Sequence, residues 1–227
     1  MLLNLNIIFN LKPYISRLIC YGLPLPVFLI SLFIGTSKYI DVMDYLGLFY
    51  KHNIGEVLTK QELLSFDIYS NVLWNIRLPR ILLTFMVGAA LSVSGAVLQG
   101  IFRNPLVDSY ILGISSGAAF GASLAILYSL SFVNIYAFVG GIIAVVITYV
   151  IASSNKQLST ITVILSGMIV SGVFIALLTM VQYISNPYKL QTIIQWTMGN
   201  LHSASWAEVK QAVLPITLTV CCSFLYR

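Results

Sequence analysis

The stretch of sequence that decides the fold class is residues 109–155, SYILGISSGAAFGASLAILYSLSFVNIYAFVGGIIAVVITYVIASSN. It contains no charged side chain and is bounded by Asp108 and Lys156. A helix needs about 20 apolar residues to cross the hydrocarbon core of a bilayer. The stretch is therefore long enough for two membrane-spanning helices, and the break between them is predicted near residues 129–134.

Other charge-free stretches flank this region on both sides. Only 8% of the residues are charged and 59% are hydrophobic, whereas a soluble domain carries about 25% charged residues. Every span is predicted as an α-helix, because a lone strand could not satisfy its backbone hydrogen bonds in lipid. The sequence thus predicts an all-α polytopic membrane protein. Residues 38–76 are predicted to form a long outer loop, and their sequence pattern predicts no helix or strand within it. The six predicted spans are residues 15–37, 78–102, 110–129, 134–152, 160–184 and 207–226.

The orientation of the spans follows from the positions of the basic residues. With six spans, both ends of the chain lie on the same side of the membrane. The positive-inside rule assigns short loops rich in Lys and Arg to the cytoplasm. We therefore expect a multi-pass protein of the inner (cytoplasmic) membrane whose N-terminus is cytoplasmic. On that side Asp108 is the single acid, and the basic residues are Lys12, Arg17, Arg103, Lys156 and Arg227.

Charge and ligand chemistry exclude several classes of function. The formal net charge is +5, but the basic residues are dispersed over loops, so nucleic acid is not an expected partner and membrane lipid is. The cysteines Cys20, Cys221 and Cys222 lie in apolar surroundings without metal-ligand spacing. His52 and His202 are single histidines without a second ligand nearby. We expect no metal site and no cofactor.

The predicted spans also lack the residues that drive transport or catalysis. No Asp, Glu, Lys or Arg lies in mid-membrane, which disfavours an ion-coupled secondary transporter. Gly95 and Gly100 have the glycine spacing of a phosphate-binding loop, but Ile101 and Phe102 replace its Lys and Ser or Thr. No nucleophile elbow is present either, so we expect no catalytic residue. Any energy for transport must come from another subunit.

Small residues recur every four positions within several spans. Gly113, Gly117 and Gly121 form such a strip in the third span, and we expect another helix to lie close against it. A packing role is favoured over a pore. We expect Gln99 to bond to another helix or to face a water-filled cavity, because an unpaired amide is costly in lipid. The same spacing relates Gly88 to Ser92, Gly95 to Gln99, and Gly167 to Ser171.

Turn residues define the predicted ends of the helices. Asn104-Pro105 predicts a turn after the second span, and Asp108 or Ser109 is expected to cap the third helix. Pro79 suits the first turn of the second span, where its missing N–H would be unpaired in any case. Kinks are expected at three prolines inside spans. These are Pro24, Pro26 and Pro215.

Several motifs occur in a fixed order along the chain. They are Arg77-Leu-Pro-Arg80, Val87-Gly-Ala-Ala-Leu-Ser-Val-Ser-Gly-Ala-Val-Leu-Gln99, Arg103-Asn-Pro-Leu-Val-Asp108, Ile111-Leu-Gly-Ile-Ser-Ser-Gly-Ala118, and Trp196-Thr-Met-Gly-Asn-Leu201 followed by Trp206. Together they resemble the FecCD family of permeases, the membrane subunits of importers for ferric siderophores, haem and vitamin B12. Ser109 departs from the family, which often has Pro after the acid.

The resemblance implies a set of partners and a docking site. A complete subunit of that family has ten helices, pairs with an identical or different second permease chain, and sits on a dimer of cytoplasmic ABC ATPase subunits. An extracytoplasmic solute-binding protein delivers the cargo. Arg77 and Arg80 match arginines that meet acidic residues of that protein. The alternative for these arginines is interfacial snorkelling, in which the stems stay in lipid and the charges reach water.

The resemblance also suggests a pathway along the fifth predicted span. Leu158-Ser159-Thr160 resembles the segment that narrows the cytoplasmic mouth of the vitamin B12 importer, although Ile161 replaces a small polar residue there. A helix N-cap by Ser159 or Thr160 is the alternative. Gly167 and Ser171 are the candidates for the face that lines the pathway.

Residues 1–227 are interpreted as a single but partial transmembrane permease domain. By the resemblance, a coupling segment and four more helices would follow, so we interpret the chain as a fragment, as one piece of a split subunit or as a decayed remnant. The predicted function is that of the permease subunit of an ATP-driven importer for iron-siderophore complexes or a related chelate such as haem or cobalamin. The alternatives are a secondary transporter and a non-functional truncated membrane fragment.

Overall fold

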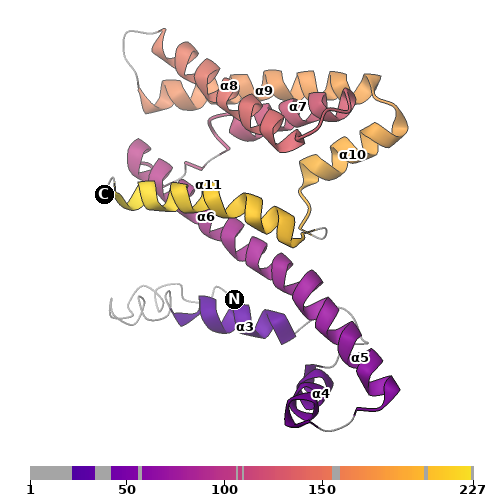
Figure 1. Ribbon diagram of the computed structural model, residues 1–227. Helices are drawn as coiled ribbons and strands as arrows, with labels where there is room; N and C mark the ends of the chain where they lie inside the picture. Colours follow the sequence, from indigo (N-terminus) through magenta and orange to yellow (C-terminus); the bar gives the residue numbers. More distant parts are fainter. Residues whose placement is uncertain are drawn as a thin grey trace, which may run out of the picture. The chain divides into compact units, whose positions relative to one another are not determined.

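The computed structural model describes residues 22–33, 42–55, 58–105, 107–108, 110–154, 159–201 and 204–225. Within these ranges the chain consists of helices and their connections, without a strand, which confirms the predicted all-α fold class. The elements, labelled in Figure 1, are α3 (Pro24–Phe33), α4 (Val42–Ile54), α5 (Lys60–Asn71), the π-helical segment η1 (Val72–Arg77), α6 (Leu78–Phe102), α7 (Ile114–Leu127), α8 (Val133–Ser153), α9 (Thr160–Ile184), α10 (Pro187–Met198) and α11 (Trp206–Leu225).

Three helical stretches in the described part of the chain are long and apolar enough to cross a membrane: Lys60–Phe102, Val133–Ser153 and Thr160–Ile184. They contain three of the predicted spans, and α6 and α9 begin and end at the predicted residues. Helix α11 matches the sixth predicted span closely. Of the first predicted span only residues 22–33 are described, and among them Pro24 and Pro26 lie in the first turn of α3. The following residues used above lie outside the described ranges: Lys12, Arg17, Cys20, Ser109, Lys156, Leu158, His202 and Arg227.

The third predicted span is shorter than expected. Helix α7 has 14 residues and begins at Ile114, because Gly113 adopts a left-handed conformation with φ of 76°, which interrupts a helix and which only glycine adopts freely. The expected cap by Asp108 is therefore wrong, since Gly113 is the N-cap and offers no side-chain bond. The Oδ1 atom of Asp108 instead accepts a hydrogen bond of 2.9 Å from the backbone N–H of Tyr110, within the turn that precedes α7.

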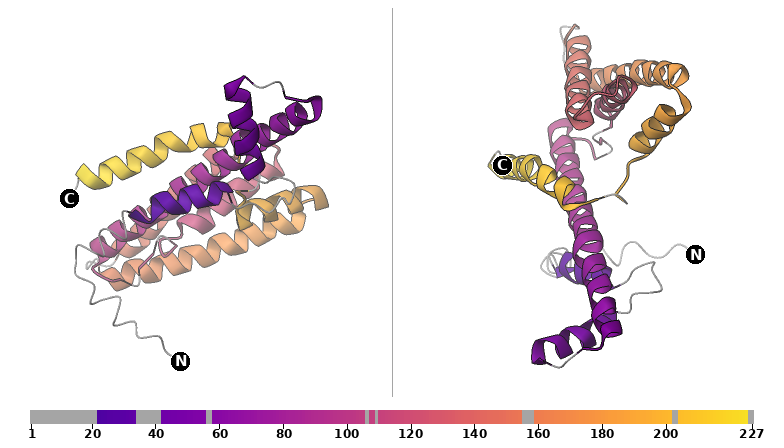
Figure 2. Two further views of the ribbon diagram at one scale, coloured as in Figure 1. Left: turned by 90° about the horizontal axis from the view of Figure 1, so that it is seen from below. Right: turned by 45° about the vertical axis from the view of Figure 1, so that its right-hand side comes forward.

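The chain divides into two compact units, Met1–Met86 with His202–Leu214 and Val87–Leu201 with Pro215–Arg227, and each is described by itself. In the first unit, α5, η1 and the start of α6 form one uninterrupted helical stretch. Pro79 therefore does not open a helix, contrary to expectation. Pro79 instead directly follows a π-helical turn, in which the N–H of Leu78 bonds five residues back to the carbonyl of Leu73. Figures 1 and 2 show α4 running across the long axis of α5.

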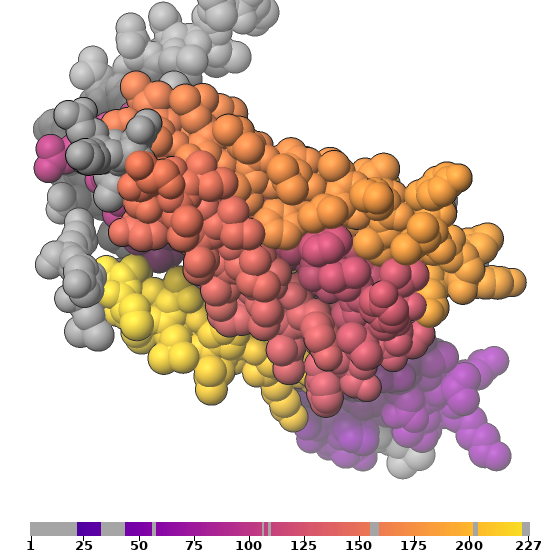
Figure 3. All heavy atoms as spheres, turned by 90° about the horizontal axis from the view of Figure 1, so that it is seen from above, coloured from indigo at the N-terminus to yellow at the C-terminus, as the bar shows by residue number. Residues whose placement is uncertain are grey.

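The second unit is built on close contact between α7, α8 and α9. A Cβ atom added to Gly117 would lie 2.5 Å from the carbonyl oxygen of Gly140 on α8, and Gly121 also meets the α8 backbone. Such contact lets helices associate in lipid, where no hydrophobic force drives them together. Phe120 packs on Phe174 of α9, with ring centroids 5.7 Å apart. In Figure 3 the atoms of these helices form a continuous surface.

Candidate functional site

The two arginines proposed for docking lie one helical turn apart, at the junction of η1 and α6. Both side chains are half-buried. The Nη1 atom of Arg77 donates a hydrogen bond of 3.2 Å to the carbonyl oxygen of Leu32, next to the end of α3. This contact ties Arg77 to a second helix of the same unit and restricts its orientation. The position at the end of a membrane-spanning helix fits both docking and snorkelling.

A tryptophan stabilises the π-helical turn that precedes these arginines. In this turn each N–H bonds five residues back, but Pro79 has no N–H to offer to the carbonyl of Trp74. The indole Nε1–H of Trp206, at the start of α11, donates to that carbonyl oxygen at 3.0 Å. In the sequence, Trp206 stands out only for its resemblance to a family segment. Pro79 was the available sequence signal for this contact, since a proline within a helical stretch leaves one backbone carbonyl in need of another hydrogen-bond donor.

An irregular backbone segment, residues 110–113, is held between α8 and α9. Gly167 of α9 contacts the carbonyl group of Ile111 so closely that a Cβ atom has no room there. The hydroxyl of Thr148, on α8 and 1% exposed, donates a hydrogen bond of 3.1 Å to the carbonyl oxygen of Leu112. Non-helical backbone is tolerated at membrane depth only when protein or water satisfies it. Thr148 and Gly167 supply that protein environment.

Replacing Thr148 by valine is expected to destabilise this unit. Valine keeps the shape of threonine but leaves the carbonyl of Leu112 without its donor, which costs about 1–3 kcal/mol for a buried group. Thr148→Ser retains the hydroxyl and is expected to cost less. The measurement is the midpoint of thermal unfolding of the purified protein in detergent. Equal losses in the two variants would show that the methyl group, and not the hydrogen bond, matters.

The residues predicted to line a pathway on α9 divide into two groups. Ser159 is the N-cap of α9, and its Oγ accepts a hydrogen bond of 3.1 Å from the N–H of Thr162, while Thr160 starts the helix. Gly167 and Ser171 face residues 111–113, so Gly167 packs against the chain's own backbone and leaves no space for cargo. On the same helix, Gly172 is exposed, and a Cβ atom added to it would meet no atom of the described residues within 4 Å.

The small and polar residues of α6 are placed differently from those of α7. A Cβ atom on Gly88 or Gly95 would meet nothing within 4 Å, so the expected packing partner of this strip is not among the described residues. Gln99 does not bond to another helix, contrary to expectation. Its Nε2 donates to the carbonyl oxygen of Pro105 at 3.0 Å, and the N–H of Asn104 donates to the Gln99 carbonyl at 3.2 Å. These bonds close the turn after α6.

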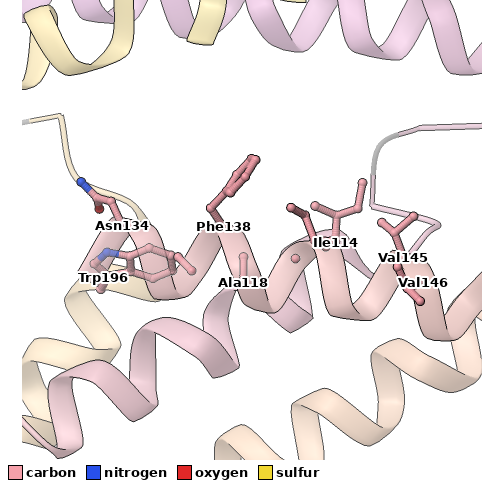
Figure 4. Close-up of a pocket in the computed structure, with 10 residues that line it drawn as sticks. Ile114, Ala118, Asn134, Phe138, Val145, Val146 and Trp196 are labelled. Carbon is pink, nitrogen blue, oxygen red and sulfur yellow. The ribbon is translucent and has the colours of Figure 1, made fainter. Parts of the chain in front are cut away.

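A shallow apolar hollow of about 560 Å³ lies along α7 and α8. Figure 4 shows Asn134 and Trp196 at one end of it and Val145 and Val146 at the other. Sequence patterns do not predict this hollow, because small residues on two helices create it only when the helices pack. Its lining is almost wholly apolar, so it can accommodate apolar groups but offers little to an ion. The lining residues are Ile114, Ala118, Asn134, Ala137, Phe138, Gly141, Ile142, Val145, Val146 and Trp196.

Helix α10 is tied to the end of α7 by Lys189, which stands out in the sequence only for its charge. The Nζ of Lys189 donates to the carbonyl oxygen of Leu127, the last residue of α7. A cation at a helix C-terminus also complements the helix dipole. Asn186 and Pro187 start α10, and Asn186 Oδ1 accepts a hydrogen bond of 2.9 Å from the Lys189 N–H. Asn-Pro before a periodic segment was the available signal for this helix.

The described residues contain no group of three or more His, Cys, Asp or Glu side chains that could hold a metal ion. What the geometry offers is a packed helical unit, a pair of arginines at one end of a span, and an irregular segment held inside the helices. The FecCD transport family matches residues 23–227, nearly the whole chain. The chain belongs to the FecCD transport family.

The relatives of this chain are named for different cargoes. The chain is 40% identical over 177 residues to "Molybdate import system permease protein MolB" of Haemophilus influenzae, covering 76% of this chain and 52% of MolB. It is 36% identical over 219 residues to "Probable iron chelatin transport system permease protein" of Helicobacter pylori, covering 96% of this chain and 64% of that protein. The chain therefore spans roughly half to two thirds of the length of these relatives.

A solved structure is similar in fold to this FecCD chain. It is described as "An inward-facing conformation of a putative metal-chelate type ABC transporter" and is 35% identical, with a TM-score of 0.69. The likeness covers 88% of this chain and 59% of the other. A further relative, "Cobalamin import system permease protein BtuC" of Halobacterium salinarum, is 41% identical over 150 residues, which are 65% of this chain and 40% of that protein.

Proposed function

We propose that this chain forms membrane-spanning helices of the permease of an ATP-driven importer for metal chelates. The observation that carries the proposal is the FecCD match over residues 23–227. Hydrolysis of ATP is assigned to a separate pair of ABC ATPase subunits, and a second permease chain and an extracytoplasmic binding protein complete the transporter. The N-terminus lies in the cytoplasm. This orientation puts α5, η1 and the start of α6, and with them Arg77 and Arg80, on the outer side of the membrane.

An iron chelate is the proposed cargo. The relative whose alignment covers 96% of this chain is named for an iron chelatin. Other relatives are named for molybdate and cobalamin, so the helices themselves are compatible with cargoes of very different size. We assign the cytoplasmic mouth of the pathway to the start of α9, at Ser159 and Thr160, and its wall to the exposed face of α9 around Gly172.

Uptake in whole cells tests this function. A strain that lacks its own iron-chelate importers receives the genes of the complete transporter, and uptake of a ferric siderophore labelled with radioactive iron is followed. Uptake should stop when ATP is depleted and should continue when a protonophore collapses the ion gradient while ATP is maintained. A secondary transporter gives the opposite pattern.

The same cells distinguish the cargo from the mechanism. Labelled molybdate and labelled cobalamin are supplied in parallel with the ferric siderophore. ATP-dependent uptake of molybdate or cobalamin alone would overturn the iron assignment and leave the importer assignment standing. Absence of ATP-dependent uptake for all three cargoes, with the complete transporter present in the membrane, would contradict the importer assignment.

A further inference from the structure

Helix α4, in the outer loop for which the sequence predicted no element, exposes one apolar face. Leu46, Tyr50 and Ile54 follow each other at intervals of four residues, and Phe49 lies beside them on the same side of the helix. Their side chains are 46%, 68%, 58% and 45% exposed, respectively. We call these four residues the α4 face. Two of them are aromatic, and Tyr in particular is enriched among residues that dominate binding at protein interfaces.

The α4 face is held in place by contacts on the other sides of the helix. Tyr45 stacks on Phe66 of α5, with ring centroids 5.6 Å apart and planes inclined by 9°. Lys51 forms an ion pair of 3.0 Å with Glu62. Glu62 also completes a capping box with Thr59 at the start of α5. The face is therefore presented by a fixed pair of helices, which lowers the entropy cost of binding a partner.

The length of the helical stretch places α4 outside the hydrocarbon core. Helix α6 has 25 residues, and at about 1.5 Å per residue it already exceeds the core thickness of about 30 Å. The 12 residues of α5 and the 6 of η1 extend about 25 Å further. Tyr45 contacts this extension at Phe66, about three turns before Arg77. Figures 1 and 2 show that α4 crosses this extension, so we infer that its face lies beyond the hydrocarbon core.

A protein is thus the occupant that this face fits, and its area argues against a permanent contact with a second copy of the chain. A stable interface buries about 800 Å² on each partner. Four partly exposed side chains offer less than that. A transient partner needs a smaller apolar contact if it also binds charged residues nearby on the same helical stretch. Arg77 and Arg80 lie on that stretch, on the side proposed to face the binding protein.

We propose that the α4 face is a second docking surface for the extracytoplasmic binding protein, which contacts it through an apolar patch while its acidic residues meet Arg77 and Arg80. This inference rests on the proposed function. The arginines attract and orient the binding protein, and the α4 face slows its dissociation. The partner is a soluble protein whose docking surface combines carboxylates with an exposed apolar patch.

The test measures affinity of the binding protein for the complete permease, assembled with its ATPase subunits in lipid nanodiscs. The double variant Phe49→Ser, Tyr50→Ser is expected to weaken binding at least about tenfold, chiefly through faster dissociation. The matched control is Leu64→Ser on α5, an apolar residue that is 66% exposed but lies outside the α4 face. Its affinity should be unchanged. Phe49→Leu, which keeps the face apolar, should retain most of the affinity.

Four outcomes would overturn the inference. Affinity could be unchanged in the double variant and lost on charge reversal at Arg77 and Arg80. This result would show that the α4 face is not a docking surface, and it would leave the proposed function standing. A change in the mass of the permease complex in the double variant would assign the face to a second permease chain. A nitroxide at position 49 that meets oxygen more readily than a polar relaxation agent would place the face in lipid. Absence of any binding by the unaltered permease would overturn the proposed function as well.

Discussion

Replacement of Gly167 by alanine is expected to disrupt the packing of α9 more than any other single methyl group added to this chain. The new Cβ atom would collide with the carbonyl group of Ile111, which is backbone and cannot rotate away. Overpacking of a close-packed site costs about 1–3 kcal/mol, and we expect the upper end of that range or more because the obstacle is main chain. The measurement is the midpoint of thermal unfolding and the yield of monodisperse protein in detergent.

The control for this experiment is Gly172→Ala on the same helix. A Cβ atom there meets nothing within 4 Å in the described part of the chain. Alanine is favoured over glycine in a helix interior by about 1 kcal/mol, so this variant should be neutral or slightly more stable. If both variants unfold at the same temperature as the unaltered protein, the contact between α9 and Ile111 is not part of the folded state.

Charge reversal at Arg77 and Arg80 is expected to weaken docking of the binding protein by about a hundredfold or more. Each glutamate would replace an attraction to a carboxylate by a repulsion, and like charges across an interface cost several kcal/mol. The association rate should fall, and added salt should now raise it instead of lowering it, because salt screens the new repulsion. Binding kinetics at several salt concentrations, with the permease in nanodiscs, measure both effects.

Lys60→Glu is the matched control, because Lys60 is an exposed basic residue at the start of the same helical stretch. It should change affinity little if docking is specific to the two arginines. Arg77→Lys preserves the charge and tests whether the bond to the Leu32 carbonyl must be kept for docking. If the reversed arginines leave affinity unchanged in a folded complex, snorkelling explains them better than docking.

The features that the sequence predicted well depend on local composition. Charge-free stretches located α9 and the end of α6, because the energetic cost of charges in lipid applies at every position of a span. The four-residue spacing of Gly117 and Gly121 also predicted a close neighbour, and these residues do meet the backbone of α8. Spacing on one helix cannot name the neighbour, so Gly88 and Gly95, which look alike in sequence, meet nothing within the described chain.

The features that it missed depend on contacts between distant residues. Gly113 looks like another member of the packing strip, but it has a positive φ and precedes the start of α7. The adjacent Leu112 carbonyl accepts a hydrogen bond from Thr148, 36 positions away. Helix α5 has weak periodicity of its own, and the periodicity of α4 does not show which helix it packs against. The two helices are joined by the stack of Tyr45 on Phe66, which sequence patterns do not reveal. Tertiary context of this kind routinely overrides local preference.

The π-helical turn of η1 gives a length change in this region an unusual geometric effect. A helix advances by about 100° and about 1.5 Å per residue. The extra residue of a π-helical turn is taken up within that turn. Removing one residue from Val72–Arg77 should therefore restore an ordinary helical turn and leave α5, with α4 attached to it, at nearly the same angle about the span axis. A deletion elsewhere in the stretch between α4 and Arg77 would instead turn α4 by about 100° relative to Arg77. The π-helical turn is thus the position at which this stretch can change length without re-aiming its outer surface.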